Sequence, residues 1–378
     1  MDDSPFLIAG GGIAGLATSL GLARIGQPSL VLEKASAFEA LGAGLQLGPN
    51  AVQALRWLGA WETVAPHCVS PAEIHVRDGL SGKLLQRLAL GAEFEKRFGA
   101  PYRVAHRADL HNALLQCAGQ NPAITLQGNT EIASVSTAET SLTLASSKTL
   151  RGKAIIAADG VHSLIRNSFN PAQQETSGNT LYRGLMPTSA VPPDTNTDVV
   201  TLWLFPGGHV VHYAVSDGKQ FNIVASVENS TTGFEHSFRR ACKPLAGLLQ
   251  RQQNWSIWNA LDIKPDNNWC RNKTLLVGDA AHAALPYLAQ GAAMALEDAC
   301  VLANTLEKMT DIPSAFGEFI RRRFARTTDI QIHSRKAGSI YHAAGPHRLA
   351  RNAALKLMPQ RHFLRRLAWI YDWKTLME

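Results

Sequence analysis

Three glycines near the N-terminus, Gly10, Gly12 and Gly15, have the spacing of a phosphate-binding turn. In such a turn the first glycine permits a tight bend and the second lets the backbone approach a pyrophosphate, while the third lets a helix pack closely on a strand. Glu33 follows 18 residues after Gly15, where a carboxylate can accept hydrogen bonds from ribose hydroxyls. The spacing therefore predicts a dinucleotide whose pyrophosphate lies at the N-terminus of a helix.

A second pair of residues with chemical potential is His209 and Tyr213. They are four residues apart, so both side chains lie on one face of a β-strand. A histidine can accept a proton near neutral pH, which makes the pair a candidate for acid–base catalysis. The alternative is that both side chains complete their hydrogen bonds on an ordinary half-buried sheet. His212 lies one residue off this face and is a weaker candidate.

The elements around the glycine turn follow from hydrophobic periodicity. Residues 6–9 form a short apolar run typical of a buried parallel strand, and residues 13–25 have the period of a helix. Gly26 stands where a helix C-cap glycine belongs, and residues 29–33 read as a second strand. We therefore expect one strand–helix–strand unit around the turn.

Two later apolar runs, 154–157 and 274–277, end beside an acidic residue and a glycine, at Asp159 and Asp279. Both are typical of central strands that open onto a ligand crevice. Between them, residues 178–265 alternate β-branched and aromatic residues with glycine turns, which predicts an antiparallel sheet. The chain after Gly291 is mainly helical. The fold class is therefore α/β with an inserted antiparallel sheet.

Composition and charge exclude several classes of protein. The net charge of +7 is concentrated late in the sequence, without a nucleic-acid-binding module, so we expect a solvated basic face and no nucleic acid. The five cysteines are scattered, which argues against a metal centre and is typical of free thiols in a reducing cytoplasm. Neither a secretory signal nor an apolar stretch long enough to span a membrane is present in this sequence. The expectation is a cytoplasmic protein.

Five motifs, in order, resemble one known family, the class A flavoprotein monooxygenases of the salicylate hydroxylase and 3-hydroxybenzoate 6-hydroxylase type. They are the turn 10–15 with Glu33, GAGLQLGPNA (42–51), HRADLH (106–111), ADGVHSLIR (158–166) and GDAAHAALPYLAQGAAMALEDA (278–299). The tail from 341 to 373 is also similar to the family's. The resemblance implies a Rossmann-type FAD-binding domain at 1–177 and 269–340, a substrate domain at 178–268, and a helical C-terminal segment at 341–378.

The resemblance also implies roles for individual residues. Arg107 lies beside the FAD pyrophosphate, where a guanidinium can bind phosphate in a fork. Asp159 lies near FAD and the incoming nicotinamide, and Asp279 binds the ribityl hydroxyls. The helix that starts at Gly291 directs its N–H groups at the flavin and stabilises its reduced, negative form. The full set of implied FAD contacts is Gly10, Gly12, Ile13, Ala14, Gly15, Glu33, Lys34, Arg107, Asp159, Asp279, Gly291, Ala292 and Ala293.

The implied reaction is ring hydroxylation. NADH or NADPH would reduce the bound FAD and O₂ would add to form a C4a-hydroperoxide, whose distal oxygen is attacked by an electron-rich ring. With a single glycine turn in the sequence, the nicotinamide nucleotide is expected to bind only transiently. In the 3-hydroxybenzoate 6-hydroxylase type, residues that match His209 and Tyr213 contact the phenolic oxygen. The favoured substrate is therefore a small hydroxylated aromatic acid.

Departures from the family leave the substrate open. Pro286 replaces an active-site glutamine of the 3-hydroxybenzoate type, and Gln46 replaces a histidine of the 6-hydroxynicotinate type. Arg183 is a candidate for binding a carboxylate. The tripeptide Tyr-Arg-Gly at 182–184, however, is a general feature of the family, so a structural role for Arg183 is favoured. A larger polycyclic or quinone substrate is the alternative within enzymes.

Two further alternatives lie outside this reaction class, a flavin-free dehydrogenase and a flavin-binding protein without turnover. The second would bind membranes through Arg348, Arg351, Lys356, Arg365 and Arg366. We favour instead a C-terminal helix that joins the domains or forms a dimer contact, because Leu349, Leu355, Leu357, Leu364 and Leu367 need burial. We expect no stable membrane association and a monomer or homodimer.

Overall fold

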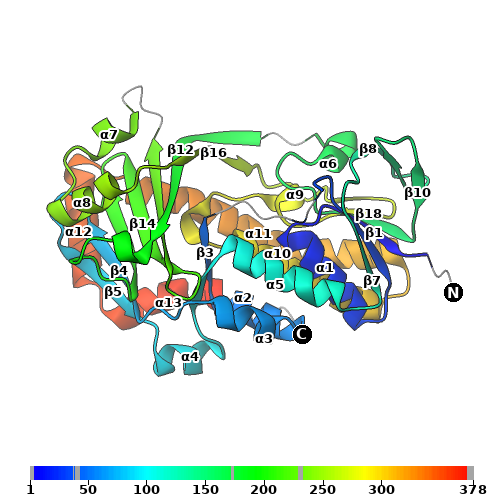
Figure 1. The fold of residues 1–378 in the computed structure, drawn as a ribbon, viewed down its shortest axis with the longest axis horizontal. Helices are drawn as coiled ribbons and strands as arrows, with labels where there is room; N and C mark the ends of the chain where they lie inside the picture. Colours follow the sequence, from blue (N-terminus) through cyan, green and yellow to red (C-terminus); the bar gives the residue numbers. More distant parts are fainter. Residues whose placement is uncertain (1–3, 37, 39–42, 172–173, 229–232, 373–378) are drawn as a thin grey trace.

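The computed structural model describes residues 4–36, 38, 43–171, 174–228 and 233–372, without the side chains of 174–177. Gly42 and Trp373, at the ends of two motifs, therefore lie outside the described residues. Two lobes lie side by side along the long axis, an α/β lobe near the N-terminus and a β-rich lobe (Figure 1). Helix α11 (Ile312–Tyr341), 30 residues long, runs along both.

The α/β lobe contains the predicted parallel sheet. Strand β1 (Phe6–Ala9) is completely buried, as expected of a central strand in a parallel sheet. It pairs in parallel with β11 (Ala154–Ala157) on one side and with β2 (Ser29–Leu32) on the other. The sheet continues through β18 (Thr274–Leu276), β17 (Cys270–Arg271) and β7 (Ile124–Gln127). The strands predicted from the apolar runs are therefore confirmed as neighbours.

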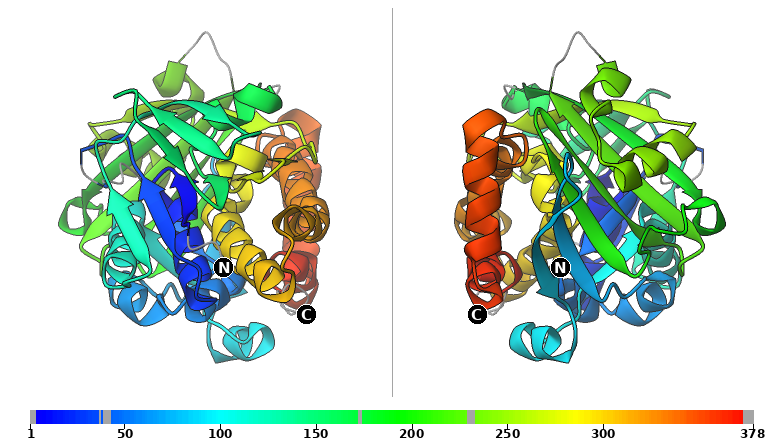
Figure 2. Two further views of the ribbon diagram at one scale, coloured as in Figure 1. Left: turned by 90° about the vertical axis from the view of Figure 1, so that its right-hand side faces the viewer. Right: turned by 90° about the vertical axis from the view of Figure 1, so that its left-hand side faces the viewer.

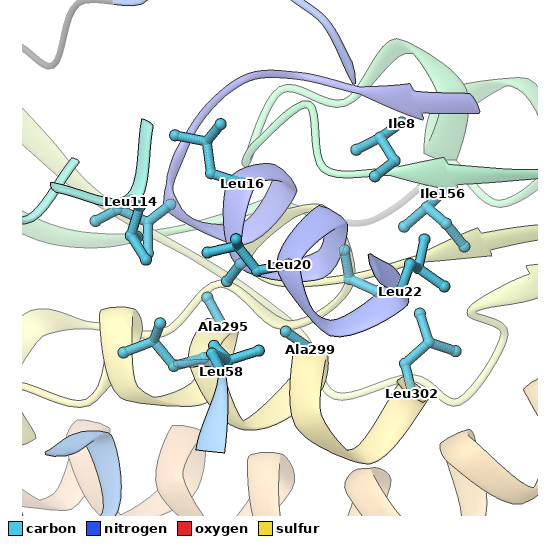
Figure 3. Packing of buried hydrophobic residues seen from close by; sticks show 14 of the residues in the cluster. Ile8, Leu16, Leu20, Leu22, Leu58, Leu114, Ile156, Ala295, Ala299 and Leu302 are labelled. Carbon is cyan, nitrogen blue, oxygen red and sulfur yellow. The ribbon is translucent and has the colours of Figure 1, made fainter. Parts of the chain in front are cut away.

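Helix α1 (Ile13–Arg24) joins β1 to β2 and is packed between the sheet and helix α10 (Gly291–Lys308). Figure 3 shows Leu16 and Leu20 of α1 in this core, with Ala299 and Leu302 on α10. A Cβ at Gly21 would lie 2.8 Å from the Ala299 carbonyl oxygen, so only glycine permits so close a helix crossing. This contact holds α1 directly against α10.

The β-rich lobe is built on a seven-stranded sheet, which confirms the predicted antiparallel sheet. Its order is β16 (Ser256–Ile263), β12 (Gln174–Pro187), β15 (Gln220–Glu228), β14 (Gly208–Val215), β13 (Val199–Phe205), β4 (Glu73–Asp78) and β5 (Leu84–Ala89). All neighbours are antiparallel except β13 and β4. Strands β4 and β5 come from the segment before residue 178, so the sheet draws strands from both sides of that predicted boundary.

Shorter elements complete the two lobes. They are β3 (Gly44–Leu47), β6 (Arg103–His106), β8 (Ile132–Ser136), β9 (Ser141–Leu144), β10 (Thr149–Arg151), α2 (Pro49–Trp57), α3 (Trp61–Val64), α4 (Ala92–Phe98), α5 (Arg107–Gly119), α6 (Leu164–Phe169), α7 (Gly233–Phe238), α8 (Lys243–Arg251) and α9 (Asp279–His282). Helix α8 covers one face of the large sheet with buried leucines. The opposite face of the sheet is therefore the one left for a ligand.

The C-terminal helices lie together along one side of the molecule (Figure 2). After α11 come α12 (Gly345–Leu357) and α13 (Gln360–Tyr371), which both contact β5. Helix α13 also contacts α2 of the α/β lobe, so it joins the lobes as expected, and its Tyr371 is buried beside the rings of Phe94 and Tyr102. The expectation that Leu349 and Leu357 are buried was wrong, because their side chains are 64% and 82% exposed.

The basic stripe considered for membrane binding is interrupted in the folded chain. Arg348 forms a forked pair with the buried Asp78, and Arg351 donates to the Ile340 and Tyr341 carbonyls. Both guanidinium groups therefore bind the protein itself. No helix among the described residues has the length and apolarity to cross a membrane.

A buried cluster of charges joins α10 to α11. Arg323 is inaccessible to solvent and donates to Glu297 and to Asp298, each at 2.7 Å. Arg326 adds two hydrogen bonds to Glu297, of 2.7 and 2.8 Å. Burial alone would raise the pKa of Glu297, but Arg326 and Arg323 lower it to about 2. Each charge in the cluster is thus neutralised by a partner.

We expect Arg323→Met to destabilise the fold by about 3–5 kcal/mol, because two buried carboxylates lose their shared partner. Urea denaturation followed by circular dichroism measures this loss. Arg321→Met on the same helix is the matched control, since its partner Glu318 is at the surface, and it should leave the unfolding midpoint almost unchanged. A midpoint for Arg323→Met close to that of the wild type would contradict the cluster's role.

The same cluster predicts an acid limit. Because the pKa of Glu297 is depressed in the folded state, its contribution to stability is complete above its ordinary value of 4.5. That contribution should disappear as the pH falls from about 4.5 to about 2. Denaturation midpoints measured across this range, for the wild type and for Glu297→Gln, check the prediction.

Candidate functional site

The glycine turn has the geometry that its spacing predicts. Gly10 adopts a φ of +103°, and a Cβ there would lie 2.5 Å from the Ala158 carbonyl oxygen. A Cβ at Gly15 would lie 1.9 Å from the Gly10 carbonyl oxygen. Around Gly12, by contrast, no atom lies within 4 Å of the Cβ position. The first and third glycines therefore permit packing, and the middle one leaves space for a ligand to approach the backbone.

Two side chains hold this turn in place. The imidazole Nε2 of His111 donates to the Gly11 carbonyl oxygen at 2.7 Å. The Gly11 N–H donates to Glu33 Oε2 at 2.8 Å, while Glu33 Oε1 accepts from the N–H of Ala35 at 3.0 Å. Sequence reasoning missed this contact of Glu33 with the turn. The contact of Glu33 with a ribose stays a prediction. The contact of Lys34 with FAD also stays a prediction, and Lys34 is exposed.

A cavity of about 300 Å³ lies where the α/β lobe meets the large sheet. Most of the predicted site residues line it, namely Gly12, Ile13, Ala14, Arg107, His209, Tyr213, Asp279, Gly291 and Ala292. Gly10, Gly15, Glu33, Lys34, Asp159 and Ala293 are outside the lining. The fold therefore brings residues from both lobes to one cavity, although they are far apart in the sequence.

The α/β side of the cavity has the donor set that an FAD molecule requires. Helix α10 begins at Gly291 with no side-chain cap and no acidic residue in its first turn, so its first N–H groups are available to an anion. Arg107 is exposed and has no ion pair among the described residues. Buried Asp159 Oδ1 has no hydrogen-bond partner there either, and Asp159 Oδ2 accepts from the Ile165 N–H at 3.2 Å. These donors and acceptors fit the phosphates and hydroxyls of FAD.

The sheet side of the cavity carries His209 and Tyr213 on β14. Both line the cavity together with Val211, which confirms that alternate residues share one face. Burial, and then the neighbouring His342, hold the pKa of His209 well below its usual range. His209 is thus a neutral imidazole at physiological pH. Its role in catalysis stays a prediction.

Tyr213 is held beside β3, whose residues form hydrogen bonds with Tyr102 and with Asn222 of β15. Burial raises the pKa of Tyr213 well above its ordinary value, opposed by a hydrogen bond with Gln46. Gln46 also accepts a hydrogen bond from the Tyr102 hydroxyl. The Gly44 N–H donates to Asn222 at 2.7 Å, and a Cβ at Gly44 would lie 2.7 Å from the Tyr213 ring. Tyr213 therefore presents a protonated hydroxyl in a fixed position.

His212 points to the opposite face of β14, as its position in the strand predicts. Its Nε2 accepts from the indole N–H of Trp203 at 2.9 Å. Burial, and then Arg77, lower the pKa of His212 to about 3. His212 is therefore a neutral packing residue beneath the sheet.

Arg183 is the residue that sequence reasoning undervalued. It lines the cavity from β12, near Tyr213 and Arg107. Its guanidinium lies over the Trp258 ring at 5.7 Å and has no hydrogen bond or ion pair among the described residues. Burial, and then repulsion by Arg107, lower its pKa, although an arginine stays protonated. A half-buried cation without a counter-ion is a strong site for an anionic ligand, and no local sequence signal reveals that it is unpaired.

The chain is similar to known flavoproteins along most of its length. Residues 3–311 match the family described as FAD binding domain. Over 387 aligned residues the chain is 35% identical to 3-hydroxybenzoate 6-hydroxylase of Polaromonas naphthalenivorans (strain CJ2), covering 99% of this chain and 97% of the relative. The structure of a salicylate hydroxylase substrate complex superposes with a TM-score of 0.82 at 26% identity, covering 99% and 98% of the two chains.

Klebsiella pneumoniae HpxO complexed with FAD and uric acid shares the fold, with a TM-score of 0.85 at 23% identity and coverage of 97% of each chain. The family match spans most of the chain and includes every predicted FAD contact. FAD is therefore the cofactor of this protein, and a flavin-free dehydrogenase no longer fits. The α/β lobe matches an FAD-binding family, and the chain aligns with an aromatic hydroxylase over almost the full length of both proteins. This protein therefore belongs to the class A FAD-dependent aromatic monooxygenases.

Proposed function

We propose that this enzyme hydroxylates a small aromatic acid that carries a phenolic hydroxyl, with NADH or NADPH and O₂ as co-substrates. When bound, FAD supplies the redox chemistry, accepting electrons from the nicotinamide and activating O₂. The observation that carries the proposal is Arg183, which has no ion pair within the described part of the chain and lines the same cavity as His209 and Tyr213. The sheet side of the cavity thus offers the Arg183 cation to the substrate's carboxylate. It offers the His209 base and the Tyr213 hydroxyl to the substrate's phenol group.

The relatives support this substrate class. The named substrates 3-hydroxybenzoate and salicylate both carry one hydroxyl and one carboxylate on a single ring. Arg107 and Arg183 together make the cavity electropositive, which favours anionic ligands. Gln46 and Pro286, which differ from the residues of the relatives, both line the cavity. This enzyme would therefore differ from those relatives in the position of the hydroxyl on the substrate ring.

Cavity size favours a single ring over a polycyclic substrate. A volume of about 300 Å³ is at the lower end of the range for ligand sites, and the flavin ring must share it. The larger secondary-metabolite substrate is therefore the second candidate. Cytoplasmic location and a monomeric or homodimeric state stay predictions from the sequence.

The proposal predicts that hydroxybenzoates accelerate NADH or NADPH oxidation by the FAD-loaded protein. A panel of benzoates, hydroxybenzoates, nicotinates, indoles and polycyclic phenols is tested, with oxygen uptake and product identification by mass spectrometry. We expect stimulation by single-ring hydroxy acids and a product one oxygen atom heavier. Stimulation by polycyclic phenols alone would favour the second candidate, and no stimulation by any compound would refute the proposal.

Arg183→Met should weaken binding of a hydroxybenzoate, because a charge-assisted hydrogen bond contributes about 1.5–3 kcal/mol. We expect Kd to rise roughly 10-fold to 150-fold, measured by the perturbation of the bound flavin spectrum. The wild type should discriminate 3-hydroxybenzoate from its neutral amide, and the variant should not. Arg87→Met, on an exposed part of the same sheet, is the control and should retain that discrimination.

His209→Asn should lower kcat for hydroxylation by about 10²–10⁴-fold, because it removes a general base. The wild type should stay active below pH 6.5, since burial keeps His209 neutral there. Activity of the variant should instead recover as the pH approaches the ordinary phenol pKa of about 10. Stopped-flow pH profiles measure both. Tyr213→Phe, which leaves the histidine in place, should show no such shift toward alkaline pH.

A further inference from the structure

Three side chains form a continuous hydrogen-bonded chain from the cavity to the protein surface. His209 Nδ1 lies 2.9 Å from His342 Nε2, and His342 Nδ1 lies 3.1 Å from Glu228 Oε1. His209 lines the cavity, and the His342 side chain is only 2% exposed, while that of Glu228 is 58% exposed. The chain therefore begins beside the substrate position and ends in water.

The partners determine which nitrogen carries each proton. An ionised carboxylate can only accept, so His342 must donate from Nδ1 to Glu228. A neutral His342 then has a lone pair on Nε2, so His209 must donate to it from Nδ1. The remaining nitrogen of His209, Nε2, is left with a lone pair. The chain is thus arranged to accept a proton at Nε2 of His209.

Both imidazoles must be neutral for this arrangement, and their surroundings favour it. Burial, and then His342, lower the pKa of His209. For His342, burial lowers the pKa and Glu228 opposes the shift, while Arg351 reinforces it. The other titratable groups that face the pair are the edge-on rings of Tyr287 and Tyr341. Burial raises the pKa of Tyr341 to about 12, so it adds no charge.

The backbone fixes the relative position of the chain's members. The Gly207 N–H donates to the His342 carbonyl oxygen at 2.9 Å, and the Glu228 N–H donates to the Gly207 carbonyl oxygen at 2.9 Å. Gly207 has a φ of +73°, which permits the β13–β14 turn to make both contacts. The two imidazole rings are stacked with an interplanar angle of 30°. The end of α11 is therefore fixed to the hairpin that presents His209.

We propose that His209, His342 and Glu228 form a proton relay that carries the substrate's phenolic proton to solvent. This inference rests on the proposed function. The phenol O–H bond breaks as an N–H bond forms at Nε2 of His209, whose Nδ1 proton moves to His342 Nε2. The Nδ1 proton of His342 moves to Glu228, which exchanges it with water. No electron is transferred, and the reverse sequence returns the proton when the product phenol forms.

The test uses the FAD-loaded, full-length enzyme with oxidised flavin and no nicotinamide, so that no turnover occurs. Bound 3-hydroxybenzoate is followed by stopped-flow absorbance of its phenolate after a pH jump. Glu228→Gln keeps the hydrogen-bond acceptor for His342 but cannot accept the proton. We expect Glu228→Gln and His342→Gln to slow phenolate formation by about 10-fold to 100-fold, with an unchanged Kd for the ligand.

Two further measurements separate a relay from a structural contact. Imidazole added to His342→Ala should restore fast phenolate formation, because it replaces the missing proton carrier, whereas a packing defect would not respond. Glu73→Gln makes the same change at a similar carboxylate–histidine contact, with His75 at 2.6 Å, on the same sheet but away from the cavity. It should leave the rate of phenolate formation unchanged.

The outcomes distinguish the relay from the function on which it rests. If the wild type forms phenolate and turns over, while Glu228→Gln and His342→Gln form it equally fast, the relay is wrong and the hydroxylase proposal stands. If the wild type binds no phenol and no hydroxybenzoate accelerates NADH oxidation, the proposed function itself fails. Slow phenolate formation in both variants with rescue by imidazole supports the relay.

Discussion

The site depends on one charged contact, the buried guanidinium of Arg323 between Glu297 and Asp298. Asp298 also accepts from His282 and from the Gly278 N–H, which fixes the loop before Asp279. Glu297 accepts from Asn50, whose amide also donates to Gln290 at the start of α10. Buried ion pairs often add little net stability, because desolvation offsets their attraction. Here the cluster fixes the position of the α10 N-terminus relative to the loop that presents Asp279.

The two lobes contribute to the site in different ways. On the α/β lobe, backbone N–H groups at the glycine turn and at Gly291 form much of the cofactor side, so its geometry depends on helix and strand packing. The sheet contributes side chains to the cavity, namely Arg183, His209 and Tyr213. Binding of the cofactor therefore tolerates changes that preserve the backbone. In the proposed function, the choice of substrate would depend on these few side chains, which can vary without altering the fold.

Electrostatics divides the cavity into a charged part and a neutral part. Arg107 and Arg183 lack counter-ions among the described residues, so the cavity has a positive field that favours anionic groups. His209 and His342 are kept neutral by burial a short distance away. A neutral imidazole has one lone pair and one proton, the state in which it can accept and pass on a proton. Helix α11 unites these features, since Arg323 and Arg326 lie along it and His342 directly follows it.

Local patterns in the sequence were sufficient for the glycine turn, the parallel strands, the inserted sheet and the shared face of His209 and Tyr213, because each depends on neighbouring residues and backbone periodicity. The tertiary structure decided what long-range packing controls. It left Arg183 without an ion pair to any described residue, and it engaged Glu33 with the turn. It also added β4 and β5 to the sheet and exposed Leu349 and Leu357. It also brought His342 to His209 across 133 positions. A side chain's partners depend on how distant elements pack, and no short-range pattern in the sequence records that.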